Sequence, residues 1–289
     1  MPRTMDGCIG LSTQDSMRLY VDDKLLIHGW GKDKSADQAL DFHFEAGRTY
    51  KIRIEFVNDR RGARVIFGYS AGWENFPAAV EAARKADVAI LCMGDNEETS
   101  GENFDRTDLN LPGRQLELVQ AVYATGTPVV LVLQSGSPVT ANWENDHLPA
   151  ILEAWFPGEQ GGTAIAKTLF GNAAPGGRLP ITFPRSVGQI PCHYSRRPGG
   201  GKRYVEMDWL PLYPFGYGLT YTTFAYRDMA LSRSVIDPQD TVTVSVTVTN
   251  TGKYTGDAVP QLYVRDMFSS VVKPERQLAA FRRLTLAPG

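Results

Sequence analysis

The pattern of apolar and polar positions divides the chain into three stretches. Residues 1–76 carry short segments that alternate with period two, as half-buried β-strands do. Residues 77–218 instead alternate continuous apolar runs with segments of helical spacing. From about residue 225 the period-two alternation returns. We therefore expect an α/β region that lies, along the chain, between two β-regions.

The first stretch predicts strands joined by tight turns. Apolar segments at 17–21 and 25–27 flank Asp22-Asp23, a pair that favours a turn. Residues 50–56 alternate regularly between polar and apolar, and residues 64–69 form a further strand candidate. We expect this stretch to form a β-domain.

The middle stretch predicts a parallel sheet. Pro77 suits the first turn of a helix, and the residues after it are rich in helix formers. Strands and helices then alternate, with strands expected at 88–93, 129–133 and 150–156 and helices at 116–123 and 163–170. Such alternation favours a parallel sheet with helices on both faces.

The last stretch predicts an antiparallel β-sandwich. Valine occupies every second position from Val242 to Val248, and serine or threonine lies between. Asn250-Thr251-Gly252 turns the chain, and residues 258–264 are expected to form the next strand. This pattern is typical of sandwiches of the immunoglobulin or fibronectin type.

A loop rich in carboxylates follows the first apolar strand of the middle stretch. Residues 94–106 carry Asp95, Glu97, Glu98, Glu102 and Asp105 directly after the apolar run that ends at Met93. In open α/β sheets, ligands bind beyond the carboxyl ends of the strands. A carboxyl group placed there can donate a proton to a bound substrate or accept one from it. The sequence therefore predicts acid/base chemistry at this loop.

Composition narrows the classes of function. The 289 residues allow two or three domains, and a hydrophobic content of 43% is enough for packed cores. A net charge of −2 argues against a nucleic-acid binder. No apolar run approaches the roughly 18 residues of a membrane span. The first residues lack the apolar core of a signal peptide, and the compartment stays open.

Metal chemistry finds little support in the sequence. Cys8, Cys92 and Cys192 lie far apart and show no metal-ligand spacing, which favours buried or free thiols. The segment from Asp95 to Glu102 fails as a calcium loop, because its glycine falls one place late and the terminal bidentate glutamate is absent. We expect neither a metal nor a cofactor.

Several long motifs, in order, resemble glycoside hydrolase family 3 of the β-glucosidase kind. They are GENFDR at 101–106, LNLPG at 109–113, AWFPGEQGG at 154–162, PGGRLPITFP at 175–184 and YPFGYGLTYT at 213–222. The first stretch resembles the carbohydrate-associated β-domain named after anthrax protective antigen, on LYVDDK at 19–24 and the turn at 45–47. In some family members that domain is inserted within the α/β sandwich, and the direct passage into the helix at Pro77 fits such an insertion.

The resemblance implies three partial or complete domains. Residues 1–76 are expected to be part of the protective-antigen-type β-domain, residues 77–224 the α/β sandwich with its linker, and residues 225–289 part of a fibronectin type III-like domain. The fold class expected is thus α/β plus all-β.

The resemblance also implies a reaction and its partners. Family members hydrolyse terminal β-linked sugars with retention, using a nucleophilic aspartate from a (β/α)₈ barrel and an acid/base glutamate from the α/β sandwich. Glu102 matches that glutamate by its position in GENFDR. Such a barrel takes about 250 residues, and none is expected in this chain. The expected partners are therefore a carbohydrate substrate and the barrel of the same polypeptide, and the isolated chain is expected to be inactive or nearly so.

Other residues of the loop are weaker candidates. Glu97 and Glu98 either line a sugar subsite or are solvated, and solvation is favoured because adjacent residues of an extended loop point in different directions. Asp105 and Arg106 are expected to brace the loop through ion pairing. Trp73 is the tryptophan singled out as a candidate for stacking on a sugar.

Two other functions stay open. Residues 68–72 fit the Gly-x-Ser-x-Gly nucleophile elbow, with Ser70 as nucleophile and Asp146 with His147 or His193 as partners. The pattern is short and often matches by chance, which makes a serine esterase the less favoured reading. A carbohydrate-binding or scaffolding remnant without catalysis is the other alternative.

Overall fold

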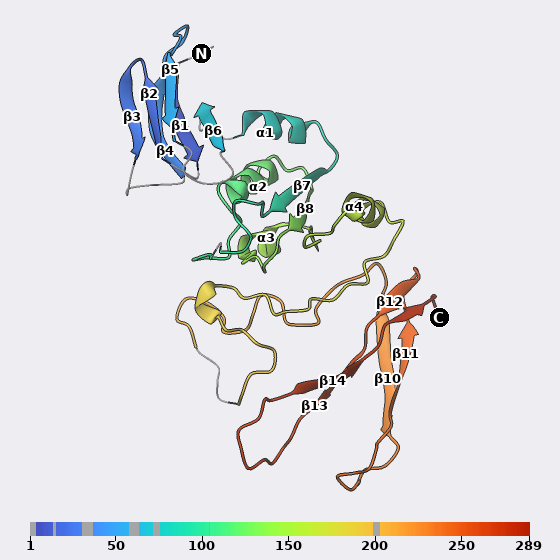
Figure 1. Cartoon of the computed structure of the whole chain (residues 1–289). Helices are drawn as coiled ribbons and strands as arrows, with labels where there is room; N and C mark the ends of the chain where they lie inside the picture. The colour runs from blue at the N-terminus through green and yellow to red at the C-terminus, as the bar shows by residue number, and fades with distance from the viewer. Residues whose placement is uncertain are drawn as a thin grey trace. The chain divides into compact units, whose positions relative to one another are not determined.

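The computed structural model describes residues 4–13, 16–30, 37–57, 64–71, 76–103, 105–198 and 203–289. The chain forms two compact units, Met1–Ala82 and Ala83–Gly289, each described below by itself (Figure 1). Within the described ranges, no helix is long and apolar enough to cross a membrane.

The first unit is built from two antiparallel sheets of three strands each. In one sheet, β1 (Met5–Thr13) lies between β4 (Asp37–Phe44) and β6 (Val65–Ala71). In the other, β2 (Met17–Val21) lies between β3 (Lys24–Gly29) and β5 (Ile52–Phe56). The strands predicted from residues 17–21, 25–27, 50–56 and 64–69 are thereby confirmed to within two residues.

The hairpin between β2 and β3 follows the turn that the sequence predicted. Asp22 and Asp23 both take positive φ, 49° and 63°, so two residues suffice to reverse the chain. Alternate residues of β1 and β2 point inward, and the core they form contains Ile9, Leu11, Met17, Leu19, Val21 and Ile27. Strand β1 escaped prediction because Gly7 and Thr13, which are not markedly apolar, occupy two of its inward positions.

The second unit begins with a parallel sheet in the order β7-β8-β9. It contains β7 (Ala89–Gly94), β8 (Val129–Gln134) and β9 (Ala150–Glu153), and both pairings are parallel as predicted. Strand β8 lies in the middle, and the side chains of Val129, Leu131, Val132 and Leu133 are at most 2% exposed. That burial on both faces explains why its sequence is a continuous apolar run.

Short helices accompany this sheet. Helix α1 (Pro77–Arg84) precedes β7, α2 (Gln115–Tyr123) precedes β8, α3 (Asn142–His147) precedes β9 and α4 (Gly161–Leu169) follows it. Strand β9 is three residues shorter than the predicted segment 150–156. Trp155 takes a positive φ of 52°, which an extended strand does not allow.

The last part of the second unit is antiparallel. Strand β10 (Phe224–Leu231) pairs with β11 (Val244–Asn250), β12 (Gly256–Ala258) with β15 (Leu284–Leu286), and β13 (Gln261–Val264) with β14 (Gln277–Phe281). The single strand predicted at 258–264 was wrong. Pro260, which has no N–H for a ladder, lies between β12 and β13.

The expected fold class is confirmed: an α/β region with a parallel sheet accompanies several small antiparallel sheets. The boundaries at 76 and 224 stay predictions, and the compact units instead separate after Ala82.

Candidate active site

Strand β7 ends at a position that accepts only glycine. Gly94 has a φ of 145°, and a Cβ atom there would lie 1.9 Å from the carbonyl oxygen of Gln134 on β8. The next amide, that of Asp95, donates to the same carbonyl at 2.9 Å. The acidic loop therefore leaves the sheet at a fixed point of its carboxyl edge.

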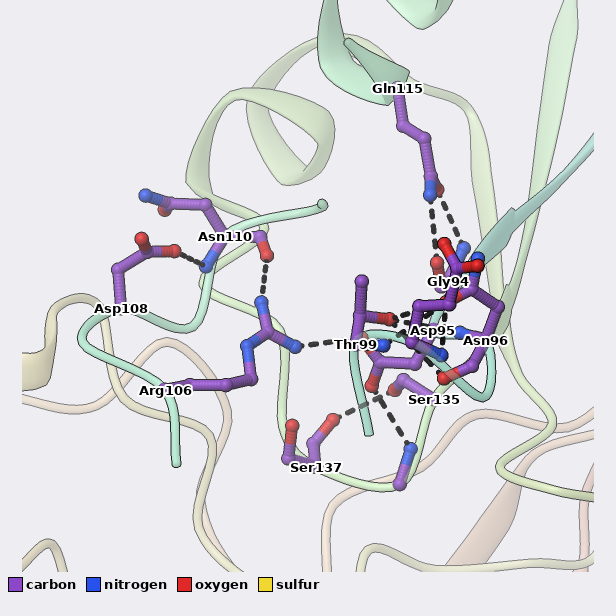
Figure 2. Close-up of polar contacts among 12 residues, drawn as sticks. Gly94, Asp95, Asn96, Thr99, Arg106, Asp108, Asn110, Gln115, Ser135 and Ser137 are labelled. Carbon is purple, nitrogen blue, oxygen red and sulfur yellow. Dashed lines mark hydrogen bonds and ion pairs between the residues drawn. The ribbon is translucent and has the colours of Figure 1, made fainter. Parts of the chain in front are cut away.

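Gln115, the first residue of α2, fixes the same strand end from the other side. Its Oε1 accepts the Gly94 N–H at 2.7 Å, and its Nε2 donates to the Gly94 carbonyl at 2.8 Å (Figure 2). One amide side chain thus satisfies both backbone groups of the residue from which the loop starts.

A buried ion pair ties the two limbs of the loop together. The Asp95 side chain is 1% exposed, and its Oδ1 accepts from Arg106 Nη1 at 2.7 Å (Figure 2). Its Oδ2 accepts the Gly136 N–H, 3.3 Å away, from the loop after β8. Arg106 also donates through Nη2 to the Asn110 carbonyl. One carboxylate and one guanidinium therefore tie Asp95, Arg106 and Asn110 together.

This pairing differs from the bracing that the sequence suggested. Arg106 pairs with Asp95, and Asp105 is exposed and makes no ion pair with any residue whose position is described. The neighbouring aspartate was the simpler partner to propose from sequence, but the guanidinium reaches back eleven positions. A structural role for Asp105 stays a prediction.

The first turn of the loop orders Glu97 and Glu98. The Asn96 side-chain oxygen accepts the amides of Glu98 at 2.9 Å and Thr99 at 3.1 Å. Both glutamates are exposed. Glu98 also lines a hollow of about 720 Å³ between the loop and α2, whose other lining residues include Asp105, Asp108 and Leu116.

Glu102 lies exposed in the turn at the tip of the loop. Asn103, which follows it, has a positive φ of 66°, so the backbone reverses here. Among the described residues, Glu102 forms no hydrogen bond or ion pair, and it does not line the hollow beside α2. Its carboxyl group is therefore free to meet a substrate or another surface.

A second carboxyl group ends strand β9, on the other side of the central strand β8. Oε1 of Glu153 accepts the Trp155 N–H at 2.9 Å, and its Oε2 is buried without a hydrogen-bond partner. The pKa of Glu153 is raised to about 7: burial raises it most, the hydrogen bond from the Trp155 N–H lowers it in part, and the Asp95 charge raises it by a smaller amount.

The loops after the three strands meet at Gly136. A Cβ atom on this residue would lie 2.8 Å from Phe156 Cε2 and 2.9 Å from Ser100 Oγ. Ser100 belongs to the acidic loop, two residues before Glu102, and Phe156 follows β9. The carboxyl edge of the sheet thus brings together the loops in which open α/β sheets bind their ligands.

The remaining candidates are placed as follows. Trp73 lies outside the described residues. Ser70 lies within β6, paired with Cys8 of β1, whereas an elbow places its serine after the strand. The His147 ring stacks on Trp143 with centroids 4.3 Å apart, and its Nδ1 faces the Trp143 carbonyl at 2.7 Å rather than Asp146. This arrangement does not support the esterase alternative.

Three residues of the site were missed from sequence: Asp95 as an anchor, Gln115 and Glu153. Asp95 was visible as the carboxylate nearest to the strand, and Glu153 as a charge within an apolar run. Gln115 carried no signal. In the part of the chain that is described, no cluster of three or more histidine, cysteine or acidic side chains could hold a metal ion.

Comparison with known families gives two matches along the chain. Residues 12–221 match the family described as glycosyl hydrolase family 3 C-terminal domain, and residues 258–289 match the fibronectin type III-like domain. A β-xylosidase of Formosa agariphila is 48% identical over 251 residues, covering 83% of this chain and 35% of that protein.

Solved structures agree with this assignment. A β-glucosidase from Erythrobacter marinus matches with a TM-score of 0.70 and 43% identity, over 74% of this chain and 29% of that one. A β-glucosidase from Kluyveromyces marxianus in complex with glucose matches over the whole chain, with a TM-score of 0.71 and 29% identity, and 37% of its own length is covered. The chain thus spans about a third of the length of these relatives, and it belongs to glycosyl hydrolase family 3.

Proposed function

We propose that this chain supplies the acid/base carboxyl group, Glu102, of a retaining β-glycosidase. The observation that carries the proposal is the anchoring of the Glu102 loop at the carboxyl edge of the parallel sheet, by Gln115 at one point and by the Asp95–Arg106 pair at another. A general acid must be held in place while its carboxyl group stays accessible. Glu102 is exposed and lies on a loop that is anchored on both sides of it, which supports this role.

The reaction needs a second carboxyl group from outside this chain. In retaining glycosidases two carboxyl groups lie about 5–5.5 Å apart across the scissile bond. One attacks the anomeric carbon and forms a glycosyl-enzyme. In our proposal that group is an aspartate of the barrel, and Glu102 protonates the departing oxygen and then takes a proton from the attacking water. In this proposal the chain supplies one of the two carboxyl groups and the barrel the other.

The substrate proposed is a terminal β-linked sugar, a glucoside or a xyloside. The names of the relatives, β-xylosidase and β-glucosidase, support this class for them, and the chain's membership in the family extends it here as a proposal. Glu98 is the better placed of the two weaker candidates for a sugar contact, because it lines the hollow beside α2. Glu97 and Trp73 remain candidates without support from the geometry.

The experiment restores the barrel. This chain replaces the matching part of the Formosa agariphila β-xylosidase, and the chimera is assayed on nitrophenyl β-xyloside and β-glucoside, with product stereochemistry followed by proton NMR. We expect hydrolysis with retention by the chimera and none by the 289-residue chain alone. Inverted product, or full turnover by the isolated chain, would contradict the proposal. A folded chimera that binds sugar without hydrolysing it would favour the non-catalytic alternative.

A further inference from the structure

A carboxyl group without a role in the proposed reaction lies at the same sheet edge as the acid/base loop. Glu153 ends β9, paired in register with Leu133 of the central strand β8. One of its oxygens accepts the Trp155 N–H, and the other is buried and has no partner. An ionised carboxylate in this place would have one oxygen that is removed from water and has no hydrogen-bond donor to replace it. The geometry therefore suits the neutral acid.

The charged neighbour of Glu153 is the anchor of the loop. The Asp95 carboxylate, on the loop after β7, acts on Glu153 and helps, after burial itself, to raise the pKa of Glu153 to about 7. Asp95 is itself 1% exposed and compensated by Arg106 at 2.7 Å. If Glu153 were ionised, two carboxylates would share the single guanidinium of Arg106. Buried charges are weakly screened, so a negative charge on Glu153 would repel the Asp95 carboxylate of the pair.

Contacts of the anchor lead from Asp95 and Arg106 toward Ser100 of the loop. Arg106 donates to the Asn110 carbonyl as well as to Asp95, and Asp95 accepts the Gly136 amide. Gly136 in turn packs so closely on Ser100 that a Cβ atom would lie 2.9 Å from its hydroxyl oxygen. Ser100 precedes Glu102 by two residues. A change in the Asp95–Arg106 pair therefore reaches the backbone that carries Glu102.

We propose that Glu153 is a positioning residue for the acid/base loop: its neutral carboxyl group keeps the Asp95–Arg106 anchor intact, and its ionisation weakens that anchor. Glu153 does not touch the reacting atoms in this account. The effect on the loop stands independently of catalysis, and the effect on turnover rests on the function proposed for Glu102.

The first test follows the anchor without any assay of activity. In the 289-residue chain, ionisation of Glu153 is followed by carbon-13 NMR of labelled glutamate carboxyl groups, and loosening of the anchor by amide exchange at Gly136, between about pH 5.5 and 8.5. The exchange is expressed as a protection factor, corrected for the intrinsic effect of pH. We expect Gly136 protection to fall about tenfold as Glu153 ionises near neutral pH.

Variants connect the two observations. Two neutral variants, Glu153→Gln and Glu153→Met, are prepared in case one of them does not fold. Each is expected to keep the Gly136 amide protected over the whole pH range. Glu159→Gln removes an exposed carboxyl group six residues away and is expected to behave as the parent chain. A Glu153 that ionises near pH 4.5, or a Gly136 protection that falls equally in the neutral variants, would overturn the proposal.

The second test uses the barrel-containing chimera. As the pH rises through neutrality, kcat of the parent is expected to fall with little change in KM. In Glu153→Gln this fall of kcat is expected to occur at higher pH. If kcat falls at the same pH in Glu153→Gln as in the parent, the proposed effect of Glu153 on turnover is wrong. If Glu102→Gln leaves turnover unchanged, the proposed role of Glu102 fails, and the exchange experiment still decides the role of Glu153.

Discussion

Gln115 bonds both backbone groups of Gly94, so one side chain of α2 completes the outer edge of strand β7. Strand β7 lies at the edge of the three-stranded sheet, where backbone groups that face away from β8 have no ladder partner. The two hydrogen bonds, 2.7 and 2.8 Å long, supply that partner at the residue where the acidic loop begins. The clamp therefore serves the sheet and the loop at once.

Replacing Gln115 should loosen this strand end. Gln115→Met keeps the length of the side chain but leaves the half-buried N–H and carbonyl of Gly94 without partners, at a cost of about 1–3 kcal/mol. Gln120→Met, on the same helix, provides the matched control, and we expect it to cost less than about 0.5 kcal/mol. Urea unfolding gives both free energies. Equal costs for the two variants would show that the clamp contributes nothing specific.

Removing Arg106 should destabilise the fold more than removing the charge of Asp95. Arg106→Met leaves a carboxylate that is 1% exposed without its cation. Removal of one partner of a buried pair typically costs about 3–5 kcal/mol. Asp95→Asn removes the charge but still offers an oxygen to Arg106, whose side chain is 20% exposed, and it should cost less, about 1–2 kcal/mol.

An exposed ion pair provides the control for the buried one. Arg233 and Asp240 are 57% and 43% exposed, so Arg233→Met should change the free energy of unfolding by less than about 1 kcal/mol. If Asp95→Asn proves as damaging as Arg106→Met, the burial of an unpaired charge is not the dominant cost.

Asn250, at the end of β11, should be intolerant of an isosteric change. Its Nδ2 donates to the carbonyls of Tyr254 and Leu286 at 2.8 and 2.9 Å, and its Oδ1 accepts from Thr222 Oγ1 and Gly252 N at 2.6 and 3.0 Å. Asn250→Asp would turn a carboxylate oxygen toward two carbonyls in a place that is 2% exposed.

We expect Asn250→Asp to cost about 3 kcal/mol or more, because two donors are lost and a charge is buried. Asn172→Asp, at an exposed position, is the control and should be close to neutral. Thermal unfolding followed by circular dichroism measures both. A similar melting temperature for the two variants would contradict the account of the Asn250 network.

The pKa of Glu153 predicts the pH dependence of stability. Its value of about 7 in the folded chain lies above the ordinary 4.5, so the unfolded chain releases this proton first as the pH rises. The stability that Glu153 contributes is therefore full below about pH 4.5 and is lost progressively up to about pH 7. The total change is about 3 kcal/mol.

Glu153→Gln isolates this contribution. The pKa of the buried Glu144 is also raised by burial. Its contribution to the pH dependence of stability is the same in the parent and the variant, so it cancels when the two free energies of unfolding are subtracted. Urea unfolding at several pH values should show the parent losing stability relative to Glu153→Gln between about pH 4.5 and 7. A difference that stays constant across this range would mean that Glu153 has its ordinary pKa.

The sequence predicted the frame of the site well because burial leaves a strong pattern. Strand β8 is covered on both faces, so its residues Val129 to Leu133 had to be apolar without interruption. The acidic loop was equally visible, since a run of carboxylates cannot continue a buried strand. The break at Pro260 was also visible, and the single strand predicted there neglected it.

The anchors of the loop could not be predicted in the same way. Gln115 lies 21 residues from Gly94, and its two hydrogen bonds depend on how α2 packs on β7. Glu153 was visible only as a charge within an apolar run, because the burial that raises its pKa is a property of the folded sheet edge. Such contacts follow from tertiary packing, which local pattern does not encode.

The most direct test of the central claim compares Glu102→Gln with Glu98→Gln in the barrel-containing chimera. A glycoside with a poor leaving group needs protonation by the general acid, whereas a dinitrophenyl glycoside does not. We predict that Glu102→Gln lowers kcat/KM for the poor leaving group by about 10²–10⁴-fold and leaves glycosylation by the dinitrophenyl glycoside largely intact, while Glu98→Gln changes neither by more than a few fold. Unchanged turnover of the poor substrate by Glu102→Gln would contradict the account.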